Sequence, residues 1–311
     1  MKEEDSKPYE VIILGGGPAG LTAGLYTSRA RLRTLLIENG IFGGQMTTTE
    51  MIENYPGFPQ GVTGDELSRL MEEQAKRFGM ETVNQEIVEV TLEGELKRVR
   101  TNETSYVCEA LIICTGAEYR KLGVPGEKEF AGKGISYCAT CDGAFFKDAT
   151  IMVVGGGDSA LTEALFLTKF VKELTIIHRR DALRATKIYQ ERALANPKIK
   201  VMWNSVVQEV KGDQIVRSVV VKNVKTGETK ELTTDGVFLF VGLSPRTEFL
   251  KSLVKLDEAR YIITDENGET SVPGIFAAGD CRKKLLRQIA TAVGDGATAA
   301  FAAEKYLENK K

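Results

Sequence analysis

The chain has little of what builds metal centres, disulfide frameworks or membrane spans. Its 311 residues include one His and five Cys. The single His, His178, has no second His or carboxylate at ligand spacing, so the sequence predicts no metal site. Five Cys in a chain of this length do not form a disulfide framework, so a Cys-x-x-Cys indicates catalysis or metal binding. No apolar run reaches the ~18 residues of a membrane span.

The charge balance and the first residues exclude further classes. The formal net charge is −2, which leaves no basic footprint for nucleic acid. The first segment, MKEEDSKPYE, is charged and lacks the apolar core of a signal peptide. The sequence therefore predicts a soluble cytoplasmic protein, and its length predicts about two domains.

The first motif follows residues 9–14, an apolar run typical of a buried parallel strand. It fits G-x-G-x-x-G with Gly15, Gly17 and Gly20, and a helix and a second strand follow it. That strand ends on Glu38. The spacing from the glycine motif to Glu38 is close to the ~20 residues that separate such a motif from the acid that binds an adenosine ribose. The helix N-terminus would then face the phosphates. A glycine turn without a ligand is the alternative, but these elements in register favour a dinucleotide.

The same unit recurs after a strand at residues 150–154, as the G-x-G-x-x-A of residues 155–160. The position equivalent to Glu38 begins the run His-Arg-Arg at 178–180, and Arg184 follows one turn later. A carboxylate suits a free ribose 2′-OH, as in FAD, whereas guanidinium groups suit the 2′-phosphate of NADPH. The alternative is that these arginines are solvated surface charge.

Two cysteines, Cys138 and Cys141, lie between the two loops. Cysteines at this spacing can close and reopen a disulfide, and a helix N-terminus would lower the pKa of the attacking thiol. Half of a zinc site and two buried thiols are the alternatives. Cys108 and Cys114 lie on or beside an apolar strand and are interpreted as buried small hydrophobes.

The remaining segments complete an alternation of strands and helices. Near the C-terminus a strand enters a Gly-Asp turn at residues 279–280, where a helix begins. Other expected elements are helices at 19–31, 65–79, 159–172 and up to about 307, and strands at 34–38, within 81–107, 110–113, 173–177, 198–203, 206–210, 216–224, 231–234 and 235–241.

Taken together, nine motifs resemble the bacterial-type, low-molecular-weight thioredoxin reductases over essentially the whole chain. Each motif alone is a weak signal, but all nine occur in the same order. They are GGGPAG at 15–20, GGQM at 43–46, ENYPGF at 53–58, TGA at 115–117, CATCDGAFF at 138–146, GGGDSA at 155–160, HRR at 178–180, AAGD at 277–280 and RQIATAVGDGATAA at 287–300.

The resemblance implies an α/β fold with two Rossmann-like nucleotide-binding domains, the second inserted into the first. An FAD-binding domain would comprise residues 1–117 and 247–311, and an NADPH-binding domain with the cysteine pair would comprise 118–246. It also implies a homodimer with thioredoxin as the protein substrate, and neither nucleic acid nor membrane as a partner.

The resemblance also implies the binding residues. For FAD they are Gly15, Gly17, Pro18, Ala19, Glu38, Gly44, Gln45, Asn54, Thr115, Gly116, Gly279, Asp280, Arg287, Gln288 and Ile289. For NADPH they are Gly155, Gly157, Asp158, Ser159, His178, Arg179, Arg180 and Arg184.

The implied reaction is NADPH:thioredoxin-disulfide reduction. Cys141 would face the flavin, Cys138 would attack thioredoxin, and Asp142 would act as acid. The alternative for Asp142 is a helix N-terminal charge that the dipole favours. Because the cysteine pair precedes the second loop, it belongs to the NADPH domain, which must rotate to alternate nicotinamide and disulfide at the flavin. Cys281 departs from the aliphatic residue more common in the family and is interpreted as packing, with slow oxidative side reactions as a point to test.

Several rivals share the scaffold. A ferredoxin-dependent flavin thioredoxin reductase or a small-molecule dithiol oxidase would not need the three arginines. A ferredoxin–NADP reductase would lack the cysteine pair. A reductase for a glutaredoxin-like or peroxiredoxin-reducing partner would have the same sequence features. A dinucleotide-binding redox sensor would bind without turnover.

Overall fold

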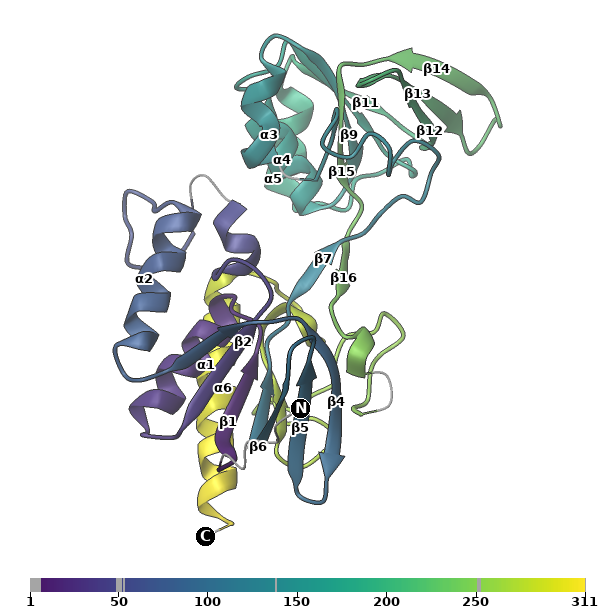
Figure 1. Cartoon of the computed structure of the whole chain (residues 1–311). Helices are drawn as coiled ribbons and strands as arrows, with labels where there is room; N and C mark the ends of the chain where they lie inside the picture. The colour runs from purple at the N-terminus through teal and green to yellow at the C-terminus, as the bar shows by residue number, and fades with distance from the viewer. Residues whose placement is uncertain (1–6, 49–51, 53, 138, 251–252, 311) are drawn as a thin grey trace. The chain divides into compact units, whose positions relative to one another are not determined.

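The computed structural model describes residues 7–48, 52, 54–137, 139–250 and 253–310. The chain divides into two compact units, unit 1 with residues 1–118 and 244–311, and unit 2 with residues 119–243. The chain enters and leaves unit 2 through β7 (Ala117–Tyr119) and β16 (Leu243–Pro245), which pair as a two-stranded sheet (Figure 1). The domain boundaries predicted after residues 117 and 246 lie at or beside these two strands.

Unit 1 is built on one large sheet with the strand order β3-β2-β1-β6-β5-β4, in which β17 also pairs with β6. The first half of β6 is antiparallel to β5, and its second half is parallel to β17, so one long strand joins both parts. The strands are β1 (Tyr9–Leu14), β2 (Thr34–Glu38), β3 (Glu81–Asn84), β4 (Ile87–Glu93), β5 (Leu96–Thr101), β6 (Ser105–Ile113) and β17 (Ile275–Ala277).

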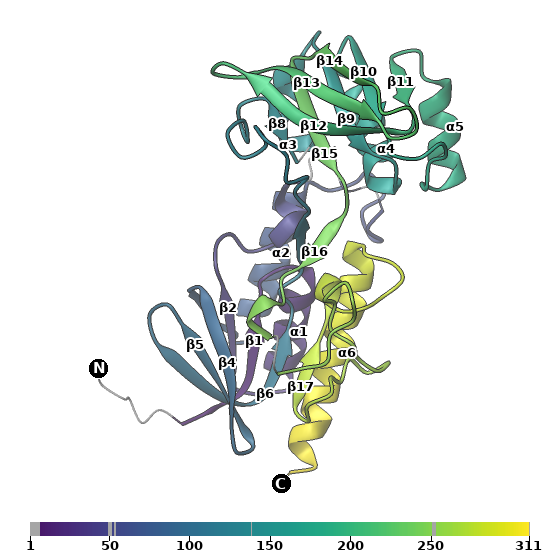
Figure 2. The same cartoon turned by 90° about the vertical axis from the view of Figure 1, so that its right-hand side faces the viewer.

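The central strand of unit 1 is buried on both faces, as parallel strands under helices are. Val11 and Ile13 pack with the helices α1 and α6, whereas Ile12 and Leu14 pack on the opposite face. Figure 2 shows α1 and α6 side by side along the sheet. The helical elements are α1 (Pro18–Arg29), η1 (Gly44–Thr48), α2 (Gly64–Lys76), η3 (Glu248–Leu250), η4 (Gly279–Cys281) and α6 (Ile289–Glu308).

Unit 2 repeats this plan with a five-stranded sheet of order β11-β10-β9-β15-β8 and a separate meander β12-β13-β14. Alternate residues of β9 again face two layers: Ile151 and Val153 pack with helices, and Met152 and Val154 pack with the meander. The elements are β8 (Ile135–Ser136), α3 (Ala139–Asp142), η2 (Gly143–Phe146), β9 (Thr150–Gly155), α4 (Asp158–Leu167), β10 (Glu173–Ile177), α5 (Lys187–Ala195), β11 (Ile199–Met202), β12 (Ser205–Gly212), β13 (Val216–Asn223), β14 (Thr229–Thr233) and β15 (Gly236–Phe240).

Most predicted elements are confirmed, and those of 9–14, 34–38 and 173–177 are confirmed to the residue. The prediction that the second loop's helix continues to 172 is wrong, because α4 ends at Leu167 and turns lead the chain into β10. Sequence analysis missed α5, in which Ala193 is the one buried residue, so its apolar residues show no helical stripe.

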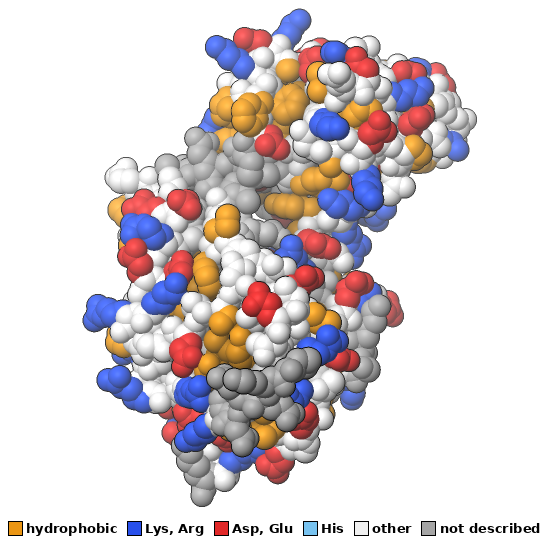
Figure 3. Space-filling model, in the orientation of Figure 1, with side chains coloured by type: hydrophobic (Ala, Val, Ile, Leu, Met, Phe, Trp, Pro, Cys, Tyr) orange, Lys and Arg blue, Asp and Glu red, His pale blue; other side chains and the backbone are white. Residues whose placement is uncertain are grey.

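Charged side chains of both signs are interspersed over the face of the molecule in Figure 3, as the near-balanced charge leads one to expect. None of the helices in the described parts of the chain is long and apolar enough to cross a membrane. The same described residues contain no group of three or more His, Cys, Asp or Glu arranged to hold a metal ion.

Candidate functional site

The carboxyl ends of four parallel strands meet at one edge of the unit 1 sheet. Leu14 at the end of β1 is in register with Ile37 of β2 and Ile113 of β6, and Ile113 is in register with Ala277 of β17. The loops that follow these strands carry many of the predicted FAD residues. Such an edge is where open α/β sheets bind their ligands.

Close backbone contacts shape the first glycine loop. Gly15 has a φ of +102°, and a Cβ there would lie 2.4 Å from the Cys114 carbonyl oxygen. A Cβ on Gly20 would lie 1.9 Å from the Gly15 carbonyl oxygen, so α1 packs directly on the turn. Gly17, in contrast, has no heavy atom within 4 Å of the Cβ position. The helix that begins at Pro18 has no side-chain cap, so its first N–H groups are oriented to bind an anion.

The Glu38 carboxylate accepts two hydrogen bonds, and one of them fixes it to this loop. Its Oε2 accepts from the Gly16 N–H at 2.5 Å, and its Oε1 accepts from the Asn39 N–H at 2.8 Å. The Gly43 N–H donates to the Gly16 carbonyl at 2.7 Å, which brings η1 against the loop. A Cβ on Gly44 would lie 3.4 Å from the Gly17 Cα, so the two backbones approach closely there.

Asp280 follows β17 and its side chain is largely buried. Its Oδ1 is inaccessible to water and has no hydrogen-bond partner among the described residues. Burial raises the pKa of this carboxyl, whereas the nearby charges of Lys284 and Arg287 lower it. An unpartnered buried carboxylate oxygen is costly unless a ligand donates to it. A polyhydroxyl group such as the ribityl chain of FAD supplies such donors, so this site fits that cofactor.

The other predicted FAD residues lie on two neighbouring segments. Asn54 Nδ2 donates to Gln288 Oε1 at 2.9 Å, which joins the loop after η1 to the start of α6. Ile289 packs with the apolar cluster below that loop. The Arg287 guanidinium lies 4.0 Å from the centroid of the Tyr261 ring.

Three further residues bind the edges of the site together. The Gln45 side chain donates to the Ala117 carbonyl, and the Thr115 hydroxyl donates to the Arg246 carbonyl at 2.7 Å. Gly116 has a φ of +67° and accepts from the Arg246 N–H, so the backbone turns sharply after β6.

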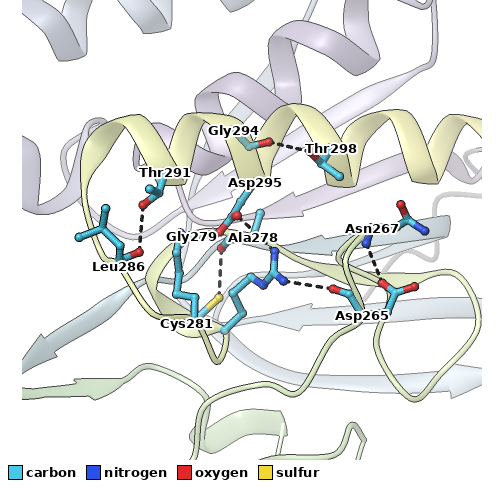
Figure 4. A network of polar contacts seen from close by, with 12 residues as sticks. Asp265, Asn267, Ala278, Gly279, Cys281, Leu286, Thr291, Gly294, Asp295 and Thr298 are labelled. Atoms are coloured by element: carbon cyan, nitrogen blue, oxygen red, sulfur yellow. Dashed lines mark hydrogen bonds and ion pairs between the residues drawn. The ribbon is translucent and has the colours of Figure 1, made fainter. Parts of the chain in front are cut away.

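Sequence analysis missed Asp295, whose side chain points from α6 toward the turn at Gly279 (Figure 4). Its carboxylate accepts from the Gly279 N–H at 3.0 Å, from Arg282 Nη1 at 3.2 Å and from Lys284 Nζ at 2.7 Å. The available signal was the neighbouring Gly296, since a glycine within a helix can mark a close backbone contact, and a Cβ there would collide with the Ala19 carbonyl oxygen.

Cys281 is fully buried beside this turn. Its Sγ lies 3.4 Å from the Ile113 carbonyl oxygen and 3.3 Å from that of Ala278, to which it donates. Burial raises the pKa of the thiol to about 11. A buried, protonated thiol is a poor nucleophile, so the structure supports the interpretation of Cys281 as packing. Cys108 and Cys114 are buried as well, as predicted.

The second glycine loop has the same construction in unit 2. A Cβ on Gly155 would lie 2.5 Å from the Phe240 carbonyl oxygen, and Gly157 has no heavy atom within 4 Å of its Cβ position. Gly157 precedes α4 without a side-chain cap. Asp158 Oδ1 accepts from the Thr186 N–H at 2.6 Å, so this carboxylate fixes the segment that follows β10.

A pocket within unit 2 opens against this loop. Four of its nine lining residues were predicted to bind NADPH, whereas the other five were missed: Tyr119, Ala160, Phe240, Gly242 and Leu243. Gly242 was the signal available in the sequence for this side of the pocket. It follows β15 with a φ of +116°, and Gly116 follows β6 of unit 1 in the same way, with a φ of +67°. The lining residues are Tyr119, Gly157, Asp158, Ser159, Ala160, Arg184, Phe240, Gly242 and Leu243.

The residues after β10 divide into a buried and an exposed group. The His178 ring is 4% exposed, and a Cβ on Gly156 would lie 2.3 Å from it. Its Nε2 lies 3.0 Å from the Ala182 carbonyl oxygen, and burial lowers the pKa of the imidazole. Arg179, Arg180 and Arg184 are exposed, and none forms an ion pair with a carboxylate of the described residues.

The cysteine pair is described only in part. Cys138 lies outside the described residues, and Cys141 belongs to α3, with its side chain likewise outside them. Ala139, at the start of α3, is fully buried among core residues of α4. Asp142 ends α3 and is the N-cap residue of η2, which is the helix-terminal position considered as its alternative role.

The sequence matches the family described as "Pyridine nucleotide-disulphide oxidoreductase" over residues 9–296. It is 52% identical to the thioredoxin reductase of Bacillus subtilis over 309 residues, which are 99% of this chain and 97% of that protein. It is 50% identical to that of Peptoclostridium acidaminophilum, over 96% and 97% of the two chains. A crystal structure of Lactococcus lactis thioredoxin reductase in the "FR conformation" is similar with a TM-score of 0.92 and 50% identity, covering 97% of this chain and 99% of that one.

The chain belongs to the thioredoxin reductases of this family.

Thioredoxin reductases of this family use FAD and NADPH. Both units of this family member fit those cofactors. Unit 1 offers the uncapped α1 and the Asp280 Oδ1, which has no partner among the described residues, and unit 2 offers the uncapped α4 and three exposed guanidinium groups. The α/β fold with two Rossmann-like nucleotide-binding domains, predicted from the sequence, is confirmed.

Proposed function

We propose that the protein passes electrons from NADPH through FAD and the Cys138–Cys141 disulfide to the disulfide of thioredoxin. The observation that supports this most is a difference between two similarly built loops. The strand after the first loop ends on the carboxylate of Glu38, whereas the strand after the second is followed by His178 and by exposed arginines that form no ion pair among the described residues. Two dinucleotides that differ by a 2′-phosphate explain this difference.

FAD would be held in unit 1. The N–H groups at the start of α1 would bind the pyrophosphate, Glu38 the adenosine ribose and Asp280 the ribityl chain. When bound, FAD accepts a hydride from NADPH and delivers the electron pair to a disulfide. The chain itself fixes the cofactor's position through the Gly43–Gly16 and Asn54–Gln288 hydrogen bonds.

NADPH would be held in unit 2, in the pocket against residues 157–160. Arg179, Arg180 and Arg184 would bind the 2′-phosphate. The buried His178 ring would act differently, because it packs under Gly156 and its Nε2 contacts the Ala182 carbonyl oxygen. We therefore assign His178 to the support of the arginine segment.

The cysteine pair would complete the path. Cys138 as thiolate attacks one sulfur of the thioredoxin disulfide, and the other thioredoxin sulfur leaves as a thiolate. Cys141 then attacks Cys138, which re-forms the enzyme disulfide and releases reduced thioredoxin. Asp142 is assigned as the acid for a departing thiolate. Rotation of the NADPH domain and a homodimer remain parts of this proposal, and the cytoplasmic location stays a prediction.

The test is an anaerobic titration of the yellow protein with NADPH and, separately, with NADH, followed by oxidised thioredoxin. NADPH should bleach the flavin and thioredoxin should restore it, and Cys138→Ser should block only the second step. If reduced ferredoxin bleaches the flavin and NADPH does not, the protein is instead a ferredoxin-dependent flavin thioredoxin reductase. Bleaching that thioredoxin does not reverse would point to another dithiol partner.

A further inference from the structure

A buried carboxylate in unit 2 belongs to none of the sites described above. Glu127 is 4% exposed and forms no ion pair among the described residues. Its Oε1 accepts from the Leu122 N–H at 2.9 Å and from the Tyr137 hydroxyl at 2.8 Å, and its Oε2 accepts from the Gly123 N–H at 2.6 Å. Three donors compensate the charge, as a buried carboxylate requires.

The backbone around Glu127 is itself fixed. Gly126 has a φ of +82°, and a Cβ there would lie 2.0 Å from the Val210 carbonyl oxygen. The Val210 N–H donates to the Pro125 carbonyl at 2.9 Å, which ties this turn to β12. The carboxylate is therefore attached to the body of unit 2 and not to a free loop.

The Tyr137 ring is held at two points. Its hydroxyl binds Glu127, and Lys121 Nζ lies 3.7 Å from the centroid of its ring. A cation over the face of a ring and a hydrogen bond at its tip fix both the ring plane and its direction. The next residue in the chain is Cys138.

We propose that Glu127 and Tyr137 are positioning residues for Cys138. Their hydrogen bond fixes Tyr137, the residue before the attacking cysteine, to the body of unit 2, and we expect this to restrict the positions open to Cys138 during exchange. Glu127 also binds Leu122 and Gly123, which follow the entry of the chain into unit 2 at Tyr119. The inference rests on the proposed function, because it concerns the cysteine that function assigns to attack.

Tyr137→Phe removes the hydrogen bond from the hydroxyl to Glu127 and keeps the contact between the aromatic ring and Lys121. The matched control is Tyr9→Phe in unit 1, where the Tyr9 hydroxyl donates to Glu81 Oε2 at 2.8 Å and the Arg33 guanidinium lies 4.2 Å from the ring centroid. Both substitutions delete one hydrogen bond from a tyrosine hydroxyl to a carboxylate, in an exposed position for Tyr9 and in a partly buried one for Tyr137.

The first readout is reoxidation of NADPH-reduced enzyme by thioredoxin in rapid mixing. In Tyr137→Phe the limiting rate at saturating thioredoxin should fall roughly 3- to 10-fold, the effect of about one hydrogen bond. The thioredoxin concentration at half-saturation and the rate of flavin reduction by NADPH should not change. Tyr9→Phe should match the wild type in all three.

The second readout needs neither thioredoxin nor turnover. It is the equilibrium between the Cys138–Cys141 disulfide and its dithiol in glutathione buffers, measured by alkylation and mass spectrometry. Loss of positioning lowers the effective concentration of one thiol near the other, so Tyr137→Phe should shift the equilibrium toward the dithiol roughly 3- to 10-fold. Glu127→Gln, which loses the charge, should shift it in the same direction.

The outcomes separate the two proposals. Failure of the wild type to reduce thioredoxin would contradict the proposed function, while the glutathione equilibrium would still decide the positioning role. A Tyr137→Phe variant with wild-type exchange and wild-type equilibrium would overturn the positioning role. So would an equal loss in Tyr9→Phe, because it would make the effect one of general stability.

Discussion

The two units of this thioredoxin reductase family member carry the same loop on the same frame, yet they differ where a nucleotide would be distinguished. In both, a strand buried on two faces enters a glycine turn, and a helix without a side-chain cap follows. In both, the middle glycine, Gly17 or Gly157, leaves open space. The shape of the loop is thus set by close backbone contacts that do not depend on the ligand.

The differences lie in the side chains around that shape. Glu38 binds the loop N–H in unit 1, whereas the His178 ring packs under the loop in unit 2. The first helical residue is Pro18 in one unit and Asp158 in the other, and Asp158 uses its carboxylate to fix the arginine segment. Ligand choice therefore depends on a few residues that the repeat leaves free to vary.

The largest expected effect concerns the third position of the loop. Gly20→Ala would place a Cβ 1.9 Å from the Gly15 carbonyl oxygen, so unit 1 should lose most of its FAD and ~1–3 kcal/mol or more of stability. The equivalent residue in unit 2 is already Ala160. Ala160→Gly should retain FAD and cost only ~1 kcal/mol. Flavin absorbance per protein and denaturant unfolding measure both; retained FAD in Gly20→Ala would contradict the close contact.

The next effect concerns the arginines. Replacing Arg179 and Arg180 by Ser should lower kcat/KM for NADPH on the order of 100-fold, since each charge-assisted hydrogen bond contributes ~1.5–3 kcal/mol. The kcat/KM for NADH should change little. Arg217→Ser, which removes an exposed arginine paired with Asp213, is the control. An equal loss with both nucleotides would mean that the pair does not bind a 2′-phosphate.

A smaller effect is expected at Asp280. Asp280→Ala removes the unpartnered buried oxygen and should weaken FAD binding about 10-fold, with NADPH binding unchanged. Equilibrium dialysis or flavin fluorescence measures the change. Asp235→Ala removes a carboxylate that binds the Thr150 N–H in unit 2 and should leave FAD affinity at the wild-type value.

The smallest expected effect concerns the helices that follow the two glycine loops, α1 and α4. Ala23 of α1 is fully buried, and its equivalent on α4 is Glu163, whose pKa burial raises to about 7. Above pH 7 Glu163 is charged in both folded and unfolded chains, and its burial costs stability. Between pH 7 and about 4.5 the folded chain alone binds the proton, so stability rises as pH falls.

Glu163→Gln should therefore be more stable than the wild type at pH 8, by about 2 kcal/mol, and this gain should disappear by about pH 4.5. Urea unfolding at several pH values measures it. Glu191→Gln, on the exposed side of α5, is the control and should show no such pH dependence. A pH-independent difference in Glu163→Gln would indicate repacking and not titration.

The sequence by itself determined the glycine loops, the strands before them, the change from the carboxylate of Glu38 to the guanidinium groups of Arg179 and Arg180, and the family. These are local features, since periodicity, turn glycines and spacing act within some 40 residues and were readable without contacts. The fold class was implied by the family resemblance, which rests on nine such local motifs.

Only the tertiary structure decided which distant residues meet. Asp295 contacts Gly279 because α6 packs against the turn, and Glu127 contacts Tyr137 with β12 fixing the turn at Pro125 just before Glu127. The burial of His178 likewise depends on its contact with Gly156 across the sheet edge. Hydrogen bonds and burial between segments far apart in the chain have no sequence period, so they become visible only when the chain is folded.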